Sequence, residues 1–457
     1  MNETAHFSLV ADEIDTADEA APPPLDRRGP LLAIFFLVGL IVFAAAFLTV
    51  HTHRELQRDS GAARTHLVLS HWLNEGYFHY FGLLVRSPAD QPAAIYRSSS
   101  GGYMVSGFVL QKLYTALFGS YSWRLIAIHN QIVSLVLAAL LGLLAYRLTR
   151  RIGLDARRAF AAGASVVIVV FTFPDNLAVY WEMSAQAYAL LFGIIFLLVD
   201  ERCVDGGRTL GHSIFQAAAV FLMAYMEGFA ALAFIAAIAA TLLVLEQRRG
   251  SWRRLVFLAL MPCVAAVALH GLQLYGVAAR FPNIEITGHT FLFRSGLDGE
   301  SFYYLDHLDI AWRRDWIRDN FPANRDALFR WPSVFILGTL STLVVLAAYI
   351  GRRIPRIAVE ALTALVGTWV LYAAVFSQSV VIHSRLYDVL LFVPLVVALF
   401  ALVPALVESL TRRTGAILLL VVLCACWYSL FQMRLYALRY PMPNTRVGAP
   451  PPTAAPR

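Results

Sequence analysis

The stretch 51–66, HTHRELQRDSGAARTH, gathers ionisable side chains directly after a long apolar run. If a helix continues out of that run, Glu55 and Asp59 lie one turn apart on the same face. Two carboxylates at this spacing resist simultaneous ionisation, so the pKa of one is raised unless an arginine compensates. A carboxylate of this kind at a membrane surface suits a general base that takes a proton from a hydroxyl group. The alternative is a solvated cap of charges at a helix end.

Other strongly polar residues lie inside apolar segments, where a charge costs roughly 3 kcal/mol on insertion scales. They fall near the same end of their segments as the stretch 51–66. We therefore expect a wet cavity open at that end, although a single histidine or glutamine there is also explained by helix packing. A carboxylate beside an aromatic ring would suit a sugar. The candidate substrate-binding residues in this group are Trp181, Glu182, Glu227, His270, His383 and Arg385.

Three arginines are candidates for binding a phosphate, because a guanidinium donates two parallel hydrogen bonds to it. Arg97 belongs to YRSSSGGYMVSG (96–107), whose serines and glycines offer further donors to an anion. This segment is not a nucleotide P-loop, because no Gly-Lys-Ser/Thr follows. Arg124 and Arg385 are the other two candidates. The alternatives are an ordinary loop around Arg97 and a membrane-interface anchor at Arg385.

A metal site is a further hypothesis for the first loop. His71, Glu75 and His79 recur every four residues, so a helix there would offer all three to one ion. The HExxH pattern is missing, and an interfacial helix uses such residues in any case. We therefore assign no metal ligands and no cofactor, and leave the need for a divalent cation open.

The composition is that of a polytopic membrane protein. The chain has 457 residues, of which 59% are hydrophobic and 15% charged, and its mean hydropathy is +0.62. The net charge of +7 comes from arginines that cluster in short loops between apolar segments. Such loops set the orientation of a membrane protein, so we do not expect a nucleic-acid partner.

Apolar runs predict an all-α transmembrane bundle of about 11 spans. A disordered cytoplasmic tail (1–30) and a disordered external tail (434–457) flank the bundle domain (31–433). The least certain region, 210–245, is read as two spans joined at Glu227, because only then do all arginine-rich loops lie on one side. The predicted spans are 31–50, 124–146, 159–174, 178–199, 210–226, 228–245, 254–275, 332–350, 357–376, 384–407 and 415–433.

Two long segments, 51–123 and 276–331, then lie on the external side. Apolar residues at helical spacing, mixed with Trp, Tyr and His, predict interfacial helices at 66–85 and 107–119. This topology places the N-terminus in the cytoplasm and the C-terminus outside.

This arrangement resembles the GT-C superfamily of integral-membrane glycosyltransferases, with an acid just beyond the first span and interfacial helices in the loop that follows. RDSGAARTHLVLSHWLNEGYF is similar to the family's loose pattern of an acid, a His-containing helix and a glycine. The resemblance implies a polyprenyl-phosphate-linked sugar as donor and a first-loop carboxylate as base, which maps to Asp59, with Glu55 second. It also implies that His383 and Arg385 contact the lipid phosphate.

The sequence therefore predicts a hexosyl- or pentosyltransferase of the bacterial inner membrane that serves cell-envelope polysaccharide biosynthesis. It would move a sugar from a polyprenyl-phosphate donor to a glycan or lipid-linked acceptor on the periplasmic side. One alternative is a transporter or flippase of a lipid-linked substrate, which would use the same cavity without chemistry. Another is an O-antigen-type ligase or polymerase, although its main catalytic loop would come late in the chain.

Overall fold

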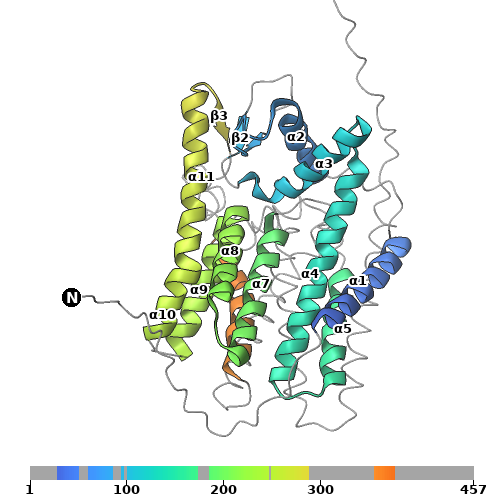
Figure 1. Ribbon diagram of the computed structural model, residues 1–457, viewed down its shortest axis with the longest axis vertical. Helices are drawn as coiled ribbons and strands as arrows, with labels where there is room; N and C mark the ends of the chain where they lie inside the picture. The colour runs from blue at the N-terminus through green and yellow to red at the C-terminus, as the bar shows by residue number, and fades with distance from the viewer. Residues whose placement is uncertain are drawn as a thin grey trace, which may run out of the picture.

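The computed structural model describes residues 28–50, 60–85, 94–96, 100–172, 185–245, 249–287 and 355–375. This part of the chain is mostly helical, and a small cap sits on one end of a bundle of long helices (Figure 1). The bundle helices are α1 (Arg28–Val50), α4 (Trp123–Arg151), α5 (Ala156–Thr172), α7 (Ala185–Gly206), α8 (Leu210–Met226), α9 (Gly228–Leu245), α10 (Arg249–Leu255), α11 (Met261–Arg280) and α15 (Arg356–Val375).

The bundle has two unlike ends. The end that carries the cap is called the loop end, and the opposite end, where the turn 151–156 and the start of α10 lie, is called the arginine end (Figure 1). Arg150 and Arg151 occupy the last turn of α4, and Arg253 and Arg254 the last turn of α10. The described arginine-rich loops therefore share one end, as predicted. That this end faces the cytoplasm stays a prediction.

The region 210–245 forms two helices, which confirms the interpretation based on loop charges. Helix α8 ends at Met226 and α9 begins at Gly228. Glu227 between them has φ −147° and ψ 89°, outside the helical region, so the chain reverses there. At its other end, α8 starts with a capping box in which the side chains of Thr209 and His212 each bond the other's backbone N–H.

Two described helices are long and apolar enough to cross a membrane, Ile128–Arg151 and Trp252–Arg280. Shorter apolar helices cover Gly29–Ala45, Leu210–Met226 and Gly228–Leu242. The predicted spans 332–350, 384–407 and 415–433, the predicted C-terminal tail and residues 1–27 of the predicted N-terminal tail lie outside the described residues. Residues 28–30, predicted to be disordered, belong to α1. The total number of spans stays a prediction.

Helix α7 runs on to Gly206, beyond the predicted end of its span at residue 199. The extra turns carry charges that bind neighbouring helices. Glu201 accepts hydrogen bonds from Arg147 (2.8 Å) and Arg151 (3.0 Å) of α4. Asp200 forms ion pairs with Arg208 (2.6 Å) and with Arg254, and accepts a hydrogen bond from Gln216 at 3.2 Å. Because these acids are paired, the helix remains ordered where hydropathy alone would end it.

The cap consists of two short helices and a small sheet. Its elements are α2 (Ser60–Glu75), β1 (Leu84–Val85), β2 (Ala94–Tyr96), the 3-10 turn η2 (Gly101–Met104), α3 (Val105–Phe118) and β3 (Glu285–Thr287). Strand β2 lies between β1, to which it is antiparallel, and β3, to which it is parallel. The sheet thus joins the two long loops 51–123 and 276–331.

This sheet corrects two predictions. The expected helix over 66–85 ends at Glu75, because Gly76 (φ 95°) adopts a left-handed conformation and a turn with Phe81 (φ 54°) and Gly82 (φ 73°) follows. The fold is therefore not all-α, although helix predominates. The second interfacial helix, predicted at 107–119, is α3 at 105–118.

Buried apolar side chains fix the cap onto the bundle. Trp72 of α2 is 1% exposed and packs edge-on against Phe108 of α3 at 5.7 Å between ring centres. Its indole N–H donates to the carbonyl of Leu83 at 3.0 Å. The same cluster includes Tyr188 of α7 and Met226 of α8. Ile126 of α4 belongs to this cluster as well, so side chains from three bundle helices position the cap.

Candidate active site at the loop end

Most of the predicted site residues lie outside the described residues, namely Glu55, Asp59, Arg97, Trp181, Glu182, His383 and Arg385. Their roles stay predictions. Of the others, Arg124 belongs to the first turn of α4, and Glu227 and His270 are described with their surroundings.

Glu227 is a buried carboxylate at the loop end, and only 2% of its surface is exposed. It is held at the α8–α9 junction, where its backbone N–H donates to Met223 and its carbonyl accepts from Ala231. Its Oε2 accepts a hydrogen bond from Nε2 of Gln186, in the first described turn of α7, at 3.4 Å. The sequence indicated Glu227 because a carboxylate between two apolar runs is costly without a role or a partner.

A chain of hydrogen bonds connects the cap with the bundle next to Glu227. The hydroxyl of Ser106, exposed on α3, lies 2.9 Å from the phenolic oxygen of Tyr188 on α7. That oxygen lies 3.5 Å from Nε2 of His129 on α4, whose Nδ1 donates to Oδ1 of Asn130 at 3.1 Å. These four residues, together with Gln186 and Glu227, are called the polar cluster.

One member of the polar cluster, Tyr188, has no distinguishing local pattern in the sequence. Ser106 belongs to the serine-glycine segment 96–107, but its contact with Tyr188 depends on α3 lying across the loop end of α7 (Figure 1). The cluster thus offers hydroxyl, imidazole, amide and carboxylate groups at the same end of the bundle. Such groups can donate hydrogen bonds to a polar substrate and accept them from it, as recognition of a sugar requires.

His270 lies ten residues before the end of α11, or roughly 15 Å along the helix. Gln273, one turn closer to the loop end, makes a hydrogen bond to the cap. Its Nε2 donates to the carbonyl of Phe81 at 2.7 Å and to the phenolic oxygen of Tyr225 at 2.8 Å. Gln273 therefore connects the first loop to α8 and α11.

The described part of the serine-glycine segment packs against α8. Ser100 donates its hydroxyl hydrogen to the carbonyl of Tyr225 and accepts the N–H of Gly102 at 3.3 Å. A Cβ on Gly102 would lie 2.6 Å from the Tyr225 ring. Residues 100–102 therefore dock the cap, and anion binding by Arg97 stays a prediction.

Glu75 is the centre of a second group of polar residues, at the end of α2. Nδ1 of His71 donates to Glu75 Oε1 at 2.6 Å, and Nε2 of His79 lies 3.8 Å from Oε2. Burial raises the pKa of Glu75, but hydrogen bonds from His71 and Tyr80 and the charges of the histidines outweigh it, so the pKa is lowered overall. Burial and the neighbouring Glu75 raise the pKa of Tyr80 to about 12.

His71, Glu75 and His79 do not share one helix, as the hypothesis of a metal site required, because α2 ends before His79. In the part of the chain that the structure describes, no group of three His, Cys, Asp or Glu side chains is arranged to hold a metal ion. The arrangement instead fixes an ionised carboxylate between two imidazoles at the surface of the cap.

Comparisons with known proteins identify similar solved structures only. No family model matches the sequence, and no curated protein matches it. The archaeal oligosaccharyltransferase AglB from Archaeoglobus fulgidus, in complex with an inhibitory peptide and a dolichol-phosphate, is 13% identical over 88% of this chain and 55% of its own, with a TM-score of 0.47. ArnT from Cupriavidus metallidurans, bound to undecaprenyl phosphate, is 14% identical over 87% of this chain and 64% of its own, also with a TM-score of 0.47.

A second structure of the Archaeoglobus fulgidus oligosaccharyltransferase, tethered to an acceptor peptide, gives 14% identity over 89% of this chain and 55% of its own, with a TM-score of 0.48. The chain thus spans 55% to 64% of the length of these proteins. They belong to the GT-C superfamily, which the first loop resembles. Because every TM-score lies below 0.5, these likenesses carry no conclusion about function.

Proposed function

We propose that this protein is a membrane glycosyltransferase that takes a sugar from a polyprenyl-phosphate donor and transfers it to a hydroxyl-bearing acceptor at the loop end. The observation that carries the proposal is the polar cluster beneath the cap. Its carboxylate, Glu227, is 2% exposed, although the helices on either side of it are apolar. A chain that only anchors itself in a membrane has no need of such a group.

In the proposed reaction, the carboxylate of Asp59 takes the proton from the acceptor hydroxyl as its oxygen attacks the anomeric carbon of the donor. The new bond forms on the face opposite the phosphate, so the configuration at that carbon inverts. The bond between the anomeric carbon and the phosphate oxygen breaks, and the oxygen keeps the electron pair. Arg385 and His383 balance the charge of the departing polyprenyl phosphate. Glu55 is the second candidate for the base.

The polar cluster has the role of holding the sugar in this scheme. Glu227 and Gln186 would accept and donate hydrogen bonds at the sugar hydroxyls. Ser106, exposed on α3, would sit where a substrate enters from the cap. Arg97, Arg124, Glu182, Trp181 and His270 are further candidates for substrate contacts.

The placement of the polar cluster favours this function over transport. A transporter that alternates its access usually binds its cargo near the middle of the membrane. Here the polar cluster lies at one end of the helices, directly beneath the cap (Figure 1). A site at that depth suits an enzyme whose acceptor arrives from one side only.

The test is label transfer by membranes that contain the chain and a radiolabelled polyprenyl-phosphate sugar. We expect Asp59→Asn to lower transfer by a factor of at least about 100, because it removes a general base. If Glu55→Gln has that effect instead, Glu55 is the base. Asp155→Asn, at the arginine end, is the control and should transfer normally. A transporter would move the labelled lipid across the bilayer and transfer no label in any form.

A further inference from the structure

Tyr225 lies in the last turn of α8, two residues before Glu227, and its carbonyl, ring and hydroxyl are each held by a different residue. The carbonyl accepts a hydrogen bond from the hydroxyl of Ser100, in the cap. The ring lies against Gly102, where an added Cβ would lie 2.6 Å away. The phenolic oxygen accepts a hydrogen bond from Nε2 of Gln273, on α11, at 2.8 Å. The position of Tyr225 is therefore fixed from the cap and from a neighbouring helix.

The contact with Ser100 completes the end of α8. The last four carbonyls of a helix receive no N–H from the regular helical pattern, so donors from outside the helix stabilise them. The backbone leaves the helical region at Glu227, and Ser100 provides such a donor to Tyr225. Ser100 in turn accepts the N–H of Gly102 at 3.3 Å. Residues 100–102 of the cap are therefore tied to the place where α8 ends.

The hydroxyl of Tyr225 connects the turn 76–82 of the cap with α11. It is hydrogen-bonded to the hydroxyl of Tyr77, and burial and this contact raise the pKa of Tyr77, so Tyr77 remains a neutral phenol. Gln273, the other partner of Tyr225, also donates to the carbonyl of Phe81 in the same turn at 2.7 Å. Both routes from this turn to the bundle therefore pass through the hydroxyl of Tyr225.

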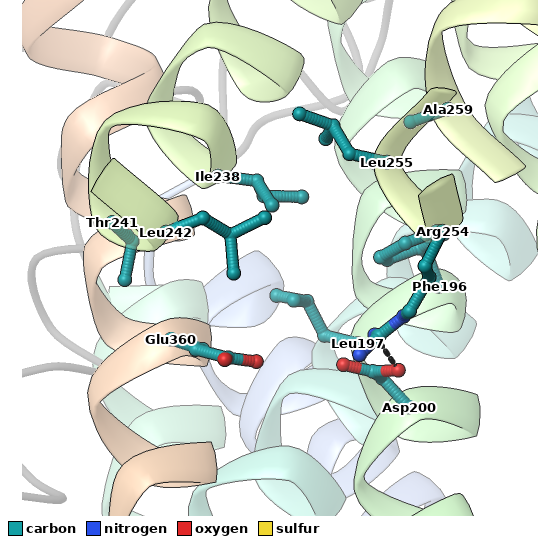
Figure 2. Close-up of a pocket in the computed structure, with 10 residues that line it drawn as sticks. All are labelled: Phe196, Leu197, Asp200, Ile238, Thr241, Leu242, Arg254, Leu255, Ala259 and Glu360. Atoms are coloured by element: carbon teal, nitrogen blue, oxygen red, sulfur yellow. Dashed lines mark hydrogen bonds and ion pairs between the residues drawn. The ribbon is translucent and has the colours of Figure 1, made fainter. Parts of the chain in front are cut away.

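The arginine end of α8 is fixed independently. Gln216 is fully buried and donates through Nε2 to Asp200 of α7 at 3.2 Å. Asp200 forms an ion pair with Arg254 of α10, among the residues that line a small pocket (Figure 2). Because α8 is bonded at both ends, it cannot shift along its axis without breaking these contacts. The contacts of Tyr225 therefore determine where α8 ends, and Glu227 is the residue at that point.

We infer that Tyr225 is a positioning residue for Glu227, through which the cap sets the direction of the carboxylate that holds the donor's sugar. The inference rests on the proposed function, in which Glu227 accepts hydrogen bonds from sugar hydroxyls. Glu227 is buried and its Oε2 accepts from Gln186 at 3.4 Å, so the carboxylate has little freedom to compensate for a displaced main chain. Hydrogen bonds weaken steeply when their geometry is distorted. Tyr225 acts without touching the sugar.

The inference is tested by binding two kinds of lipid to the purified full chain: polyprenyl phosphate, and the same lipid carrying glucose, mannose or arabinose. Tyr225→Phe keeps the ring and removes the hydroxyl. We expect its affinity for the sugar-bearing lipid to fall about fivefold, because a hydrogen bond to the sugar is weakened, and its affinity for the bare lipid to stay within about twofold. Tyr275→Phe, the same change at an exposed position of α11, is the matched control and should bind both lipids normally.

A double-mutant cycle separates positioning from a general loss of stability. Glu227→Gln should weaken binding of the sugar-bearing lipid about tenfold, because a carboxylate accepts stronger hydrogen bonds than an amide. In that background Tyr225→Phe should add less than about twofold, because its effect passes through Glu227. In label transfer, Tyr225→Phe should raise KM for the donor and leave kcat within about twofold. Ser100→Ala removes the contact at the carbonyl and should give the same sugar-dependent loss, so the test does not depend on the folding of one variant.

Three outcomes would overturn the inference: equal weakening of both lipids, unchanged binding of the sugar-bearing lipid in both single variants, or effects of Tyr225→Phe and Glu227→Gln that multiply in the double variant. If the unmodified protein binds both lipids equally, the proposed function fails and the inference fails with it. Sugar-dependent losses in a protein that transfers no label would contradict the proposed reaction alone and leave the role of Tyr225 standing.

Discussion

Gln273 and Phe81 are 192 positions apart in the sequence, yet the side-chain amide of Gln273 donates to the main-chain carbonyl of Phe81 at 2.7 Å. Phe81 has φ 54°, a left-handed conformation that costs a bulky residue roughly 1–2 kcal/mol. Its ring packs on Gly276, where an added Cβ would lie 3.1 Å away. Helix α11 therefore holds the turn of the first loop in a conformation that the loop would not adopt alone.

Removing this amide should loosen the cap. In Gln273→Leu the carbonyl of Phe81 loses its donor, which costs about 1–3 kcal/mol for a buried acceptor. We expect amide hydrogen exchange in residues 76–85 to speed up by roughly tenfold or more, because local opening becomes easier. Exchange within α4 should not change. Gln131→Leu on α4 is the control, and equal exchange in residues 76–85 of both variants would contradict this role of Gln273.

The charge network at the arginine end should contribute strongly to stability. The side chain of Glu201 is 2% exposed, and those of its partners Arg147 and Arg151 are each 7% exposed. Glu201→Gln removes the charge of the buried carboxylate that both guanidinium groups contact, so we expect a loss of about 3–5 kcal/mol in the free energy of unfolding. Thermal unfolding of this variant and of the unmodified protein in detergent measures the loss.

Asp155→Asn is the control for that measurement. Asp155 pairs with Arg158 at the surface, with more than half of each side chain exposed. It also accepts the backbone N–H groups of Arg157 and Arg158 at the start of α5, and asparagine caps a helix equally well. We expect an unchanged unfolding temperature. A drop in unfolding temperature as large as that of Glu201→Gln would show that the burial of Glu201 does not explain its effect on stability.

Acid should weaken the end of α2. The folded state lowers the pKa of Glu75 below its usual 4.5. The ionised carboxylate therefore contributes fully to the free energy of unfolding above pH 4.5, and this contribution disappears as the pH falls through the lowered pKa. The charged groups facing Glu75 are His71 and His79. We expect pepsin to cut residues 76–85 faster as the pH falls from about 5 to about 3.

The Glu75→Gln variant separates this effect from the pH dependence of pepsin itself. Its amide does not titrate, so the ratio of its cleavage rate to that of the unmodified protein should fall towards one as the pH drops. Glu285→Gln in β3 is the control and should behave like the unmodified protein throughout. A constant ratio for Glu75→Gln over this range would exclude Glu75 as the titrating group.

Replacement by alanine at two glycines should have opposite effects on the stability of the protein. A Cβ on Gly101 would overlap the carbonyl oxygen of Gly82 and lie 2.6 Å from the Trp72 ring, whereas nothing lies within 4 Å of a Cβ on Gly271. We expect Gly101→Ala to destabilise the protein by about 1–3 kcal/mol through overpacking. Gly271→Ala, inside α11, should stabilise it by roughly 0.5–1 kcal/mol. Thermal unfolding compares the two, and equal shifts would contradict the close packing of the cap.

Much of the described bundle was predictable because hydropathy and loop charge act locally. The two helices on either side of Glu227 were predicted with their boundaries, since one helix would have put the arginine-rich loops on both sides. The end of α7 was not predicted correctly, because Asp200 and Glu201 are stabilised by arginines of other helices. Their pairing depends on the packed bundle and is not visible in a single segment.

The cap sheet and part of the site could not be predicted for the same reason. Strands β1 and β2 have two and three residues, too few for a period of alternation, and β3 comes from the other long loop. Glu227 was identified because a carboxylate between apolar runs is conspicuous. Tyr188 was not, since it resembles any tyrosine of a membrane helix until Ser106 and His129 are placed beside it.

In the proposed site, the polar cluster at the loop end holds the donor's sugar, so the donor's phosphate lies beside the cluster. Photo-cross-linking of the purified protein tests this placement, with a polyprenyl phosphate that carries a photoreactive group next to the phosphate. We predict labelled peptides from residues 125–131, 185–190 and 225–231, and loss of the label when unlabelled polyprenyl phosphate is added in excess. Labelling confined to the arginine end, or labelling that the excess lipid does not reduce, would contradict the claim.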